Sequence, residues 1–467
     1  MLTSKDVVKL IESQSGKITS EIIKDLIKEH KNKKENYEKL YKIYAGDVEI
    51  KERKFVNKNK VNNKINNDYA GDIVDNMIGY MFGEEISYVI DKTKYNETDL
   101  KKYSDKLENF RKFNSIPDLD STTAEMTSIC GVGGRLLYVD KEGQERIMNL
   151  NPWEVIFVND PTLDIMKYAL IYYPIEIKIG KDIVKRTKVE WYDEQNVSFF
   201  ISDEKGEFVP DSNIEKTTMP HMFKFVPVIK FANNNLEQGD FEKVLETINS
   251  YDRTISDMQN EIEEFRIAYF AWYGAEPTVE VIQLARETGA LFFQENTDGK
   301  FITKPLDQVV EFMKDHKKTL NDNIYKFSKS VDMRDESFSG GAVSGESRKW
   351  KLFNFENRAK SKERKFEKAL RYQFKVLCSA WQVKELNLDH RNINFVFKRN
   401  LPVDVEYEAR ATSQLVGKVS EDTRLGLVSF VTDVDAEKQK MEDDKGIDLD
   451  KIDALKKIIE NQKDLNK

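Results

Sequence analysis

The stretch GDFEKVLETINSYDRTISDMQNEIEEF, residues 239–265, decides the fold. Its apolar side chains recur every three or four positions, which is the spacing of one helical face: Phe241, Val244, Leu245, Ile248, Tyr251, Ile255, Met258, Ile262 and Phe265. The stripe is narrow and covers about seven turns, some 37 Å at about 1.5 Å per residue. We therefore expect one long helix that packs along a single edge.

A second amphipathic helix is predicted over about 306–331. One largely apolar face of it contains Val309, Met313, His316, Leu320, Ile324 and Phe327. Between the two helices, residues 266–274 read as a strand and 278–290 as a short helix. Residues 291–306 read as a hairpin that turns at Asp298–Gly299. A chain that leaves along one helix and returns along another forms a stalk with a small α/β tip.

The loop after the returning helix, SFSGGAVSGES at 337–347, has nearly the spacing of a nucleotide-binding P-loop. However, Glu346 stands where a P-loop needs lysine, and the loop follows a predicted helix rather than a strand. Asp332, Asp335 and Glu336 add negative charge. A mobile connector is the better interpretation, with Ser344 near the N-cap of a third helix and Glu346 in its first turn. A nucleotide-dependent enzyme that uses residues 340–347 remains the alternative.

The third helix, predicted over about 346–386, is unusually basic. Residues 346–375 contain eleven Lys and Arg against four Glu. An apolar face runs along it: Trp350, Phe353, Phe366, Leu370 and Phe374. The basic residues either pair with acidic neighbours or lie close to a polyanion.

Residues 86–235 change to short β-like runs separated by Gly, Pro, Asn and Asp. The predicted strands lie at 86–90, 134–140, 154–160, 168–173, 188–193, 197–203 and 225–231, with a helix over 98–128. Helices are also expected over 5–45, in the second half of 51–83 and over 403–440, and a strand over 392–400. The charged tail, 441–467, is expected to be helical or disordered. The fold class is therefore α+β.

Composition and single residues exclude several functions. The 467-residue chain has a formal net charge of −8, which argues against a conventional basic nucleic-acid binder. Two distant cysteines, Cys130 and Cys378, fit a reduced intracellular protein. We expect no signal peptide and no membrane span. The isolated histidines predict no metal site, Glu261, Glu263 and Glu264 read as a solvated face, and we expect no cofactor and no catalytic constellation.

Three segments resemble the portal (head-to-tail connector) proteins of long-tailed bacteriophages, especially those of Gram-positive hosts. The most specific is NNKINNDYAGDIVDNMIGYMFGEEISY at 62–88. NNNLEQGDFEKVLETINSYDRTISDMQNEIEEF at 233–265 is similar to that family's linker and first stem helix. DESFSGGAVSGESRKWKLFNFENRAKSKERKFEKAL at 335–370 is similar to its tunnel loop and long helix. The resemblance covers about residues 35–430.

The resemblance implies a portal fold, with a mixed α/β wing, a two-helix stem, a small α/β clip, a long kinked helix and a helical crown. It divides the chain as follows: 1–235 wing, 236–265 stem helix, 266–305 clip, 306–331 stem helix, 332–349 tunnel loop, 350–400 wing helix and returning strand, and 401–467 crown and charged tail. Similar proteins form a closed ring, typically of twelve subunits, in the virion.

The resemblance also implies site residues. The tunnel loop that faces DNA would contain Ser337, Phe338, Ser339, Gly340, Gly341, Ala342, Val343, Ser344, Gly345, Glu346, Arg348 and Lys349. The clip that docks other proteins would use Tyr269, Trp272, Tyr273, Glu276, Arg286, Asp298 and Lys300. Stem packing between subunits would use Ile255, Met258, Ile262, Met313, Leu320, Ile324 and Phe327.

The implied function is a channel at one capsid vertex through which double-stranded DNA is packaged and ejected. The implied partners are further copies of the chain, the DNA, the terminase large subunit, a head-tail adaptor, and the major capsid and scaffolding proteins. The resemblance also implies that no membrane is involved, that the chain is not an enzyme, and that assembly takes place in the host cytoplasm. A non-viral helical scaffold, which would form dimers or filaments rather than closed rings, is a further alternative.

Overall fold

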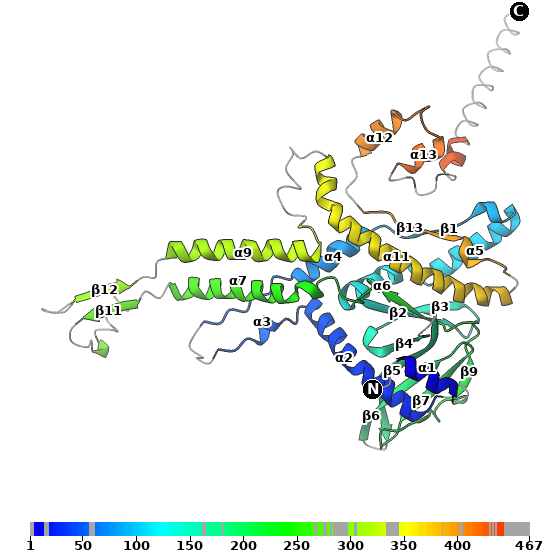
Figure 1. The fold of residues 1–467 in the computed structure, drawn as a ribbon, viewed down its shortest axis with the longest axis horizontal. Helices are drawn as coiled ribbons and strands as arrows, with labels where there is room; N and C mark the ends of the chain where they lie inside the picture. The colour runs from blue at the N-terminus through cyan, green and yellow to red at the C-terminus, as the bar shows by residue number, and fades with distance from the viewer. Residues whose placement is uncertain are drawn as a thin grey trace, which may run out of the picture. The chain divides into compact units, whose positions relative to one another are not determined.

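The computed structural model describes residues 4–13, 18–55, 61–160, 165–179, 182–265, 269–273, 278–280, 283, 298–302, 306–332, 345–384, 386–400, 405–428, 431, 434 and 437–442. The chain divides into two compact units, residues 1–399 and 400–467. Figure 1 shows the elements of both units. The first unit contains runs of helices and runs of antiparallel strands, which confirms the α+β class.

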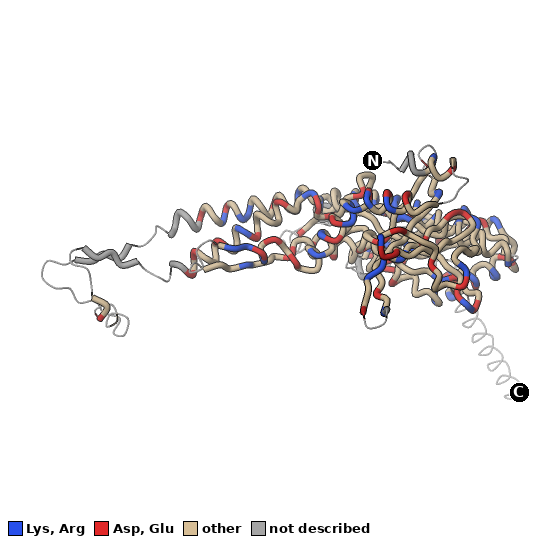
Figure 2. The backbone as a smooth tube through the Cα atoms, turned by 90° about the horizontal axis from the view of Figure 1, so that it is seen from below, with Lys and Arg blue, Asp and Glu red and all other residues tan. Residues whose placement is uncertain are grey.

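The two predicted long helices are present. Helix α7 spans Leu245–Phe265, after a 3-10 turn η3 at Glu242–Val244, and helix α9 spans Leu306–Ser328. They lie side by side in both views (Figures 1 and 2). Their roots enter a core with α2 (Ser20–Tyr44) and α4 (Tyr69–Phe82), in which Ile248 and Ile324 are buried. We call α7 and α9 the helix pair.

The segment between the paired helices contains a small antiparallel ladder. Strand β11 (Tyr269–Tyr273) pairs with β12 (Asp298–Ile302), so the strand expected at 266–274 is confirmed over its central residues. The predicted turn at Asp298–Gly299 is wrong, because these residues lie within β12 opposite Tyr273 and Trp272. Pairing with a distant strand has overridden a dipeptide that favours turns in isolation. Of the helix expected over 278–290, the structure describes residues 278, 279, 280 and 283, and all but the first are helical.

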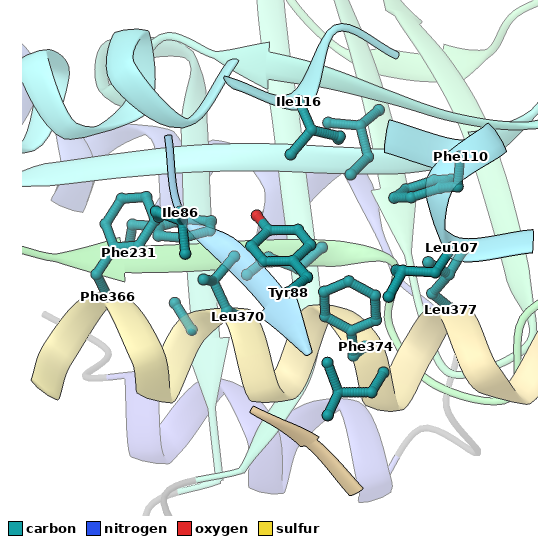
Figure 3. Close-up of a cluster of buried hydrophobic side chains, with 14 of the residues drawn as sticks. Ile86, Tyr88, Leu107, Phe110, Ile116, Phe231, Phe366, Leu370, Phe374 and Leu377 are labelled. Carbon is teal, nitrogen blue, oxygen red and sulfur yellow. The ribbon is translucent and has the colours of Figure 1, made fainter. Parts of the chain in front are cut away.

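The third long helix, α11, runs from Gly345 to Val383 and forms one wall of the largest core. Figure 3 shows Leu370 and Phe374 projecting from α11 toward Tyr88 of β1 (Ser87–Ile90), and Phe366 beside Phe231. Helices α5 (Glu97–Phe113) and α6 (Ile116–Cys130) close this core. Trp350 and Phe353, which we expected on the same apolar face, are instead 74% and 53% exposed.

Three sheets complete the first unit. A three-stranded sheet has the order β10 (Val228–Ala232), β2 (Val132–Val139), β3 (Glu145–Leu150). A larger sheet runs through β4 (Val155–Asn159), β5 (Met166–Ile179), β6 (Asp182–Tyr192), β7 (Asn196–Ser202) and β8 (Phe208–Pro210), with β9 (Thr218–Pro220) also on β7. Strand β13 (Ile393–Val396) pairs with β1. All seven predicted strands of the β-rich region are present, and β3, β8 and β9 were missed.

Several predicted helices are divided. The helix expected at 98–128 is broken between α5 and α6, where Ser115 has a φ of 50° and Pro117 lies in the first turn of the next helix. The helix expected at 5–45 forms α1 (Ser4–Ser13) and α2. Short turns occur at α3 (Glu49–Glu52), η1 (Lys92–Lys94), η2 (Pro152–Glu154) and η4 (His390–Asn392).

The second unit, residues 400–467, contains α12 (Val405–Ser413) and α13 (Glu421–Gly426). Leu425, Val428 and Val431 form a small apolar cluster. The helix predicted over 403–440 is therefore present in pieces. Most of the predicted charged tail, 441–467, lies outside the described residues.

Candidate functional site

The loop expected to face DNA lies mostly beyond the described residues. Ser337 to Ser344 are outside them, so the phosphate-binding alternative and the N-cap prediction for Ser344 stay predictions. Gly345 begins α11, and Glu346, Arg348 and Lys349 follow in its first turns. The predicted helix start near residue 346 is therefore confirmed, and the loop joins two long helices, α9 and α11.

The predicted docking residues come together in part. Tyr269, Trp272 and Tyr273 lie on β11, and Asp298 and Lys300 lie on β12. The ladder places Lys300 opposite Ala271 and Asp298 opposite Tyr273. Glu276 and Arg286 lie outside the described residues. Five of the seven residues thus share one two-stranded ladder between α7 and α9.

The apolar stripe of the helix pair changes character along its length. At its root, Ile324 is fully buried within the chain, and Ile255 and Leu320 pack against the same core. Met258 and Met313 are half-buried. Ile262, in the last turn of α7, is 53% exposed. On α9, Phe312 is 71% exposed, and Phe327, one residue before the helix ends at its root, is 58% exposed. The exposed members are apolar surface that a single chain leaves in water.

A strap, residues 61–68, lies along α7 and was not predicted. The strap donates three backbone hydrogen bonds to side chains of α7: Asn63 N to Asn260 Oδ1 (2.8 Å), Ile65 N to Ser256 Oγ (3.0 Å) and Asn67 N to Asp252 Oδ1 (3.1 Å). Residues two apart in the extended strap meet residues four apart on the helix, so both periodicities are satisfied. The three acceptors are buried, at 1%, 0% and 7% exposure for Asp252, Ser256 and Asn260.

Side chains reinforce the strap. The Asn63 and Asn67 amides donate again to Asn260 Oδ1 (2.9 Å) and Asp252 Oδ1 (2.7 Å). Burial raises the pKa of Asp252, against the two hydrogen bonds from Asn67. Arg53, just before the strap, forms an ion pair with Asp257 of α7. One face of α7 is therefore occupied by the chain's own polar strap. The sequence did contain a signal for it, because the polar residues Asp252, Ser256 and Asn260 recur every four positions along α7.

The root of the helix pair is fastened to α11 by buried charges. Asp240, just before η3, forms ion pairs with Arg358 (2.8 Å) and with Lys362 (3.2 Å), both on α11. Burial alone would raise the pKa of Asp240, but the two cations hold it well below the usual range of a carboxyl. Burial lowers the pKa of Lys362, against the attraction of Asp240.

The same network reaches three other elements. Asn233, after β10, donates to Asp240 Oδ1 at 2.6 Å. Arg358 Nη1 donates to the carbonyl of Ser328 at the end of α9 (2.5 Å), and Lys362 Nζ donates to Ser128 Oγ of α6. The start of α7 and the end of α9 are thus held to the helix that follows the predicted tunnel loop. We call Asp240, Arg358 and Lys362 the root network.

Charge is uneven over the helix pair. Helix α7 contains six Asp and Glu and one Arg, whereas α9 contains four acidic residues and four Lys. Figure 2 shows the acidic positions distributed along the pair. Glu263, expected on a solvated face, accepts hydrogen bonds from Asn63 (3.2 Å) and Gln259 (3.0 Å).

Comparison with known proteins identifies the family. A family model described as "Phage portal protein, SPP1 Gp6-like" matches residues 23–448. The chain belongs to this family of phage portal proteins. A portal protein of Clostridium phage phiCD119 is 25% identical over 394 residues, which cover 79% of this chain and 82% of the relative. The portal protein of Bacillus phage SPP1 is 24% identical over 341 residues, which cover 69% of this chain and 65% of the relative. The resemblance stated from sequence is confirmed.

The described part of this portal-family chain offers little for chemistry. Within it, no group of three His, Cys, Asp or Glu side chains is placed to hold a metal ion, and no helix has the length and apolar character needed to cross a membrane. Cys130 and Cys378 are buried free thiols, and burial raises the pKa of each to about 12. Both thiols are therefore protonated and poor nucleophiles near neutral pH.

Proposed function

We propose that this portal-family chain assembles into a closed ring, with twelve subunits as the expected number, at one vertex of a phage capsid. The ring would form a channel through which double-stranded DNA is packaged and ejected. The family match over residues 23–448 supports this function. The proposal assigns the stem to the helix pair, the clip to the segment between α7 and α9, and the tunnel loop to residues 332–349.

The observation that carries the proposal is the exposed apolar part of the helix pair. Ile262, Phe312 and Phe327 are each more than half exposed in the single chain. Burying a large apolar side chain stabilises an interface by about 1.5–3 kcal/mol. A head-to-tail interface that buries these residues at every subunit boundary closes into a ring when the rotation permits. The strap already covers another face of α7, which leaves these side chains for neighbouring copies.

The charge of the chain suits a channel that must let DNA slide. The affinity of proteins for DNA grows with each phosphate that Lys or Arg neutralises, so a wall with few free cations grips DNA weakly. The net charge of −8 and the acidic composition of α7 support this picture. In the proposal, the glycines of the tunnel loop let it adjust as DNA passes, and Glu346 weakens any grip.

Docking of other proteins is assigned to the clip, which contains the β11–β12 ladder. Terminase would bind there during packaging and supply the ATP hydrolysis, and a head-tail adaptor would bind afterwards. The remaining surface of the first unit would contact the major capsid and scaffolding proteins. The chain itself would act as a conduit and an assembly platform rather than an enzyme.

Substitution of one exposed apolar residue tests the proposal. We expect Ile262→Asp to reduce the ring fraction in mass photometry, because a carboxylate would be desolvated at each interface. Ile183→Asp is the matched control, since Ile183 is 67% exposed on β6, away from the helix pair. Rings that form equally well with Ile262→Asp would contradict the proposed interface.

A further inference from the structure

A hollow lies between helix α2 and the larger sheet. Its floor is apolar, with Ile27 of α2, Tyr172 of β5 and Phe208 of β8. These three side chains belong to, or pack against, the core that α2 forms with this sheet. The volume of the hollow is about 390 Å³, which is within the usual range of ligand pockets. The fold therefore leaves an apolar hollow on the outside of this core.

The floor is held in place by buried contacts. Tyr172 is only 5% exposed, and its hydroxyl forms a hydrogen bond with Nδ1 of His30 at 2.9 Å. Burial, followed by the charges of Lys33 and Lys34, lowers the pKa of His30 to about 4. The imidazole is therefore neutral near neutral pH, and the positive charge beside the hollow comes from lysines.

The rim of the hollow is basic. The charged side chains that line it are all lysines of α2, namely Lys24, Lys28, Lys31 and Lys34. Their spacing of three or four residues keeps them on one side of the helix. No Asp or Glu is among the lining residues that the structure describes. Lys24 pairs with Glu207, just before β8, whereas Lys28 has no ion pair with any described residue.

Two of these lysines pair only weakly. Lys31 and Lys34 lie 3.8 Å from Glu35 and Glu38, one turn later on α2. Surface pairs of this kind contribute little to stability. The Lys34 ammonium also lies 5.0 Å from the ring centroid of Tyr172. The lysines can therefore exchange these carboxylates for those of a partner with little loss.

An apolar floor beside a row of lysines is complementary to a ligand that is both apolar and anionic. A nucleic-acid backbone would satisfy the lysines, but its phosphates offer no apolar group to the floor. We propose that this hollow docks an acidic amphipathic segment of a partner protein, with an apolar side chain on the floor and carboxylates along the lysine row. Lys24 to Lys34 span about 15 Å, the length of about three turns of a partner helix laid along α2.

This site goes beyond the proposed channel. Every lining residue belongs to the first unit of one chain, and none belongs to the helix pair, the clip or the tunnel loop. The docking therefore does not depend on ring closure. Only the identity of the partner rests on the proposed function, in which capsid and scaffolding proteins contact the first unit.

Fluorescence anisotropy of the full chain with a labelled designed peptide tests this site. The probe is an amphipathic helix with a stripe of leucines flanked by glutamates. Wild type is compared with Lys28→Gln/Lys31→Gln and with the control Lys101→Gln/Lys102→Gln, two exposed lysines of α5. We expect the first variant to bind about fivefold more weakly at low salt and the control to bind as wild type does. A probe whose leucines are replaced by serine should bind wild type about tenfold more weakly.

Charge reversal tests direct contact. Lys28→Glu/Lys31→Glu should lose the glutamate probe and gain a matching probe that carries lysines in place of the glutamates. A photo-crosslinker at the central leucine of the probe should label the chain at Tyr172 or Phe208. Labelling confined to other elements would contradict the site.

The remaining arms separate this proposal from simple charge attraction and from the ring. Unassembled chains and rings are measured separately, so lysine-dependent binding by unassembled chains supports the site even if rings never form. Equal affinities of wild type and Lys28→Gln/Lys31→Gln would overturn it, whether or not rings form. Equal binding of the leucine and serine probes would also overturn it, because the floor would then contribute nothing. Displacement of the probe by a short DNA duplex at equal charge would overturn the assignment to a protein partner.

Discussion

Asp240→Asn should be strongly destabilising, because it removes the one carboxylate of the root network while keeping its shape. The side chains of Lys362 and Arg358 are only 2% and 14% exposed. The least costly response of Lys362 is to release its proton. At pH 7.5 this costs about 4 kcal/mol, since a free lysine has a pKa near 10.4 and each unit corresponds to about 1.36 kcal/mol. Removal of one partner from a buried pair typically costs about 3–5 kcal/mol, which agrees.

The variant should also gain a pH dependence whose sign is defined. In Asp240→Asn, the unfolded chain binds a proton at Lys362 that the folded chain lacks, so the free energy of unfolding rises with pH. The expected slope is about 1.4 kcal/mol per unit between about pH 7.5 and 9.5. The loss of stability is therefore largest at the lower pH and shrinks as pH rises toward the pKa of free lysine. A loss caused only by altered packing would not follow this slope.

Guanidinium unfolding curves at the two pH values, followed by tryptophan fluorescence and circular dichroism, provide the assay. Asp257→Asn is the matched control: Asp257 pairs with Arg53 but its side chain is 50% exposed, so we expect a loss below about 1 kcal/mol. Asp240→Asn/Lys362→Met should recover most of the lost stability, because it removes the stranded charge. A loss below about 1 kcal/mol, or a double variant no more stable than Asp240→Asn, would refute the reasoning.

Three other perturbations address the strap, the loop and the clip. Asp252→Ala removes the acceptor of the Asn67 backbone amide, so it should lower the free energy of unfolding by about 1–3 kcal/mol and speed hydrogen exchange at that amide. Asp252→Asn keeps an acceptor oxygen and should recover most of the lost stability. Equal losses in the two variants would argue against the hydrogen bond. Shortening Ser339–Gly345 should leave ring assembly intact but reduce DNA packaging or retention in a packaging assay, whereas loss of rings would make the loop architectural. Trp272→Ala should weaken terminase or adaptor binding to intact rings, and unchanged binding would contradict the clip assignment.

Sequence periodicity predicted the long helices well, because burial of an apolar stripe is a local pattern. The stripe of α7 and the Phe366, Leu370 and Phe374 face of α11 both lie where the spacing placed them. Periodicity could not show how far a stripe is covered. Ile324 is fully buried whereas Phe327, three residues later, is 58% exposed, although the next residue, Ser328, is buried again.

Buried polar groups were the main omission, because their partners lie far away in the sequence. The basic residues of the third helix were expected to pair with acidic neighbours or to lie close to a polyanion. Nothing in the sequence indicated that Lys362 is buried or that its partner is Asp240, 122 residues earlier. Arg135 lies in a predicted strand and is fully buried, where it pairs with Asp120 (2.8 Å) and lies over the ring of Phe231. The turn prediction at Asp298–Gly299 failed for the same reason, because pairing with strand β11 decides the conformation of these two residues. Such partners appear only when the topology is known.

Images of the purified protein viewed along the symmetry axis test the central claim most directly. Two-dimensional class averages and native mass should show closed rings with a central channel and one dominant subunit number, across a range of salt concentrations. Monomers, dimers or open filaments under all of these conditions would contradict the proposal that this portal-family chain closes around DNA.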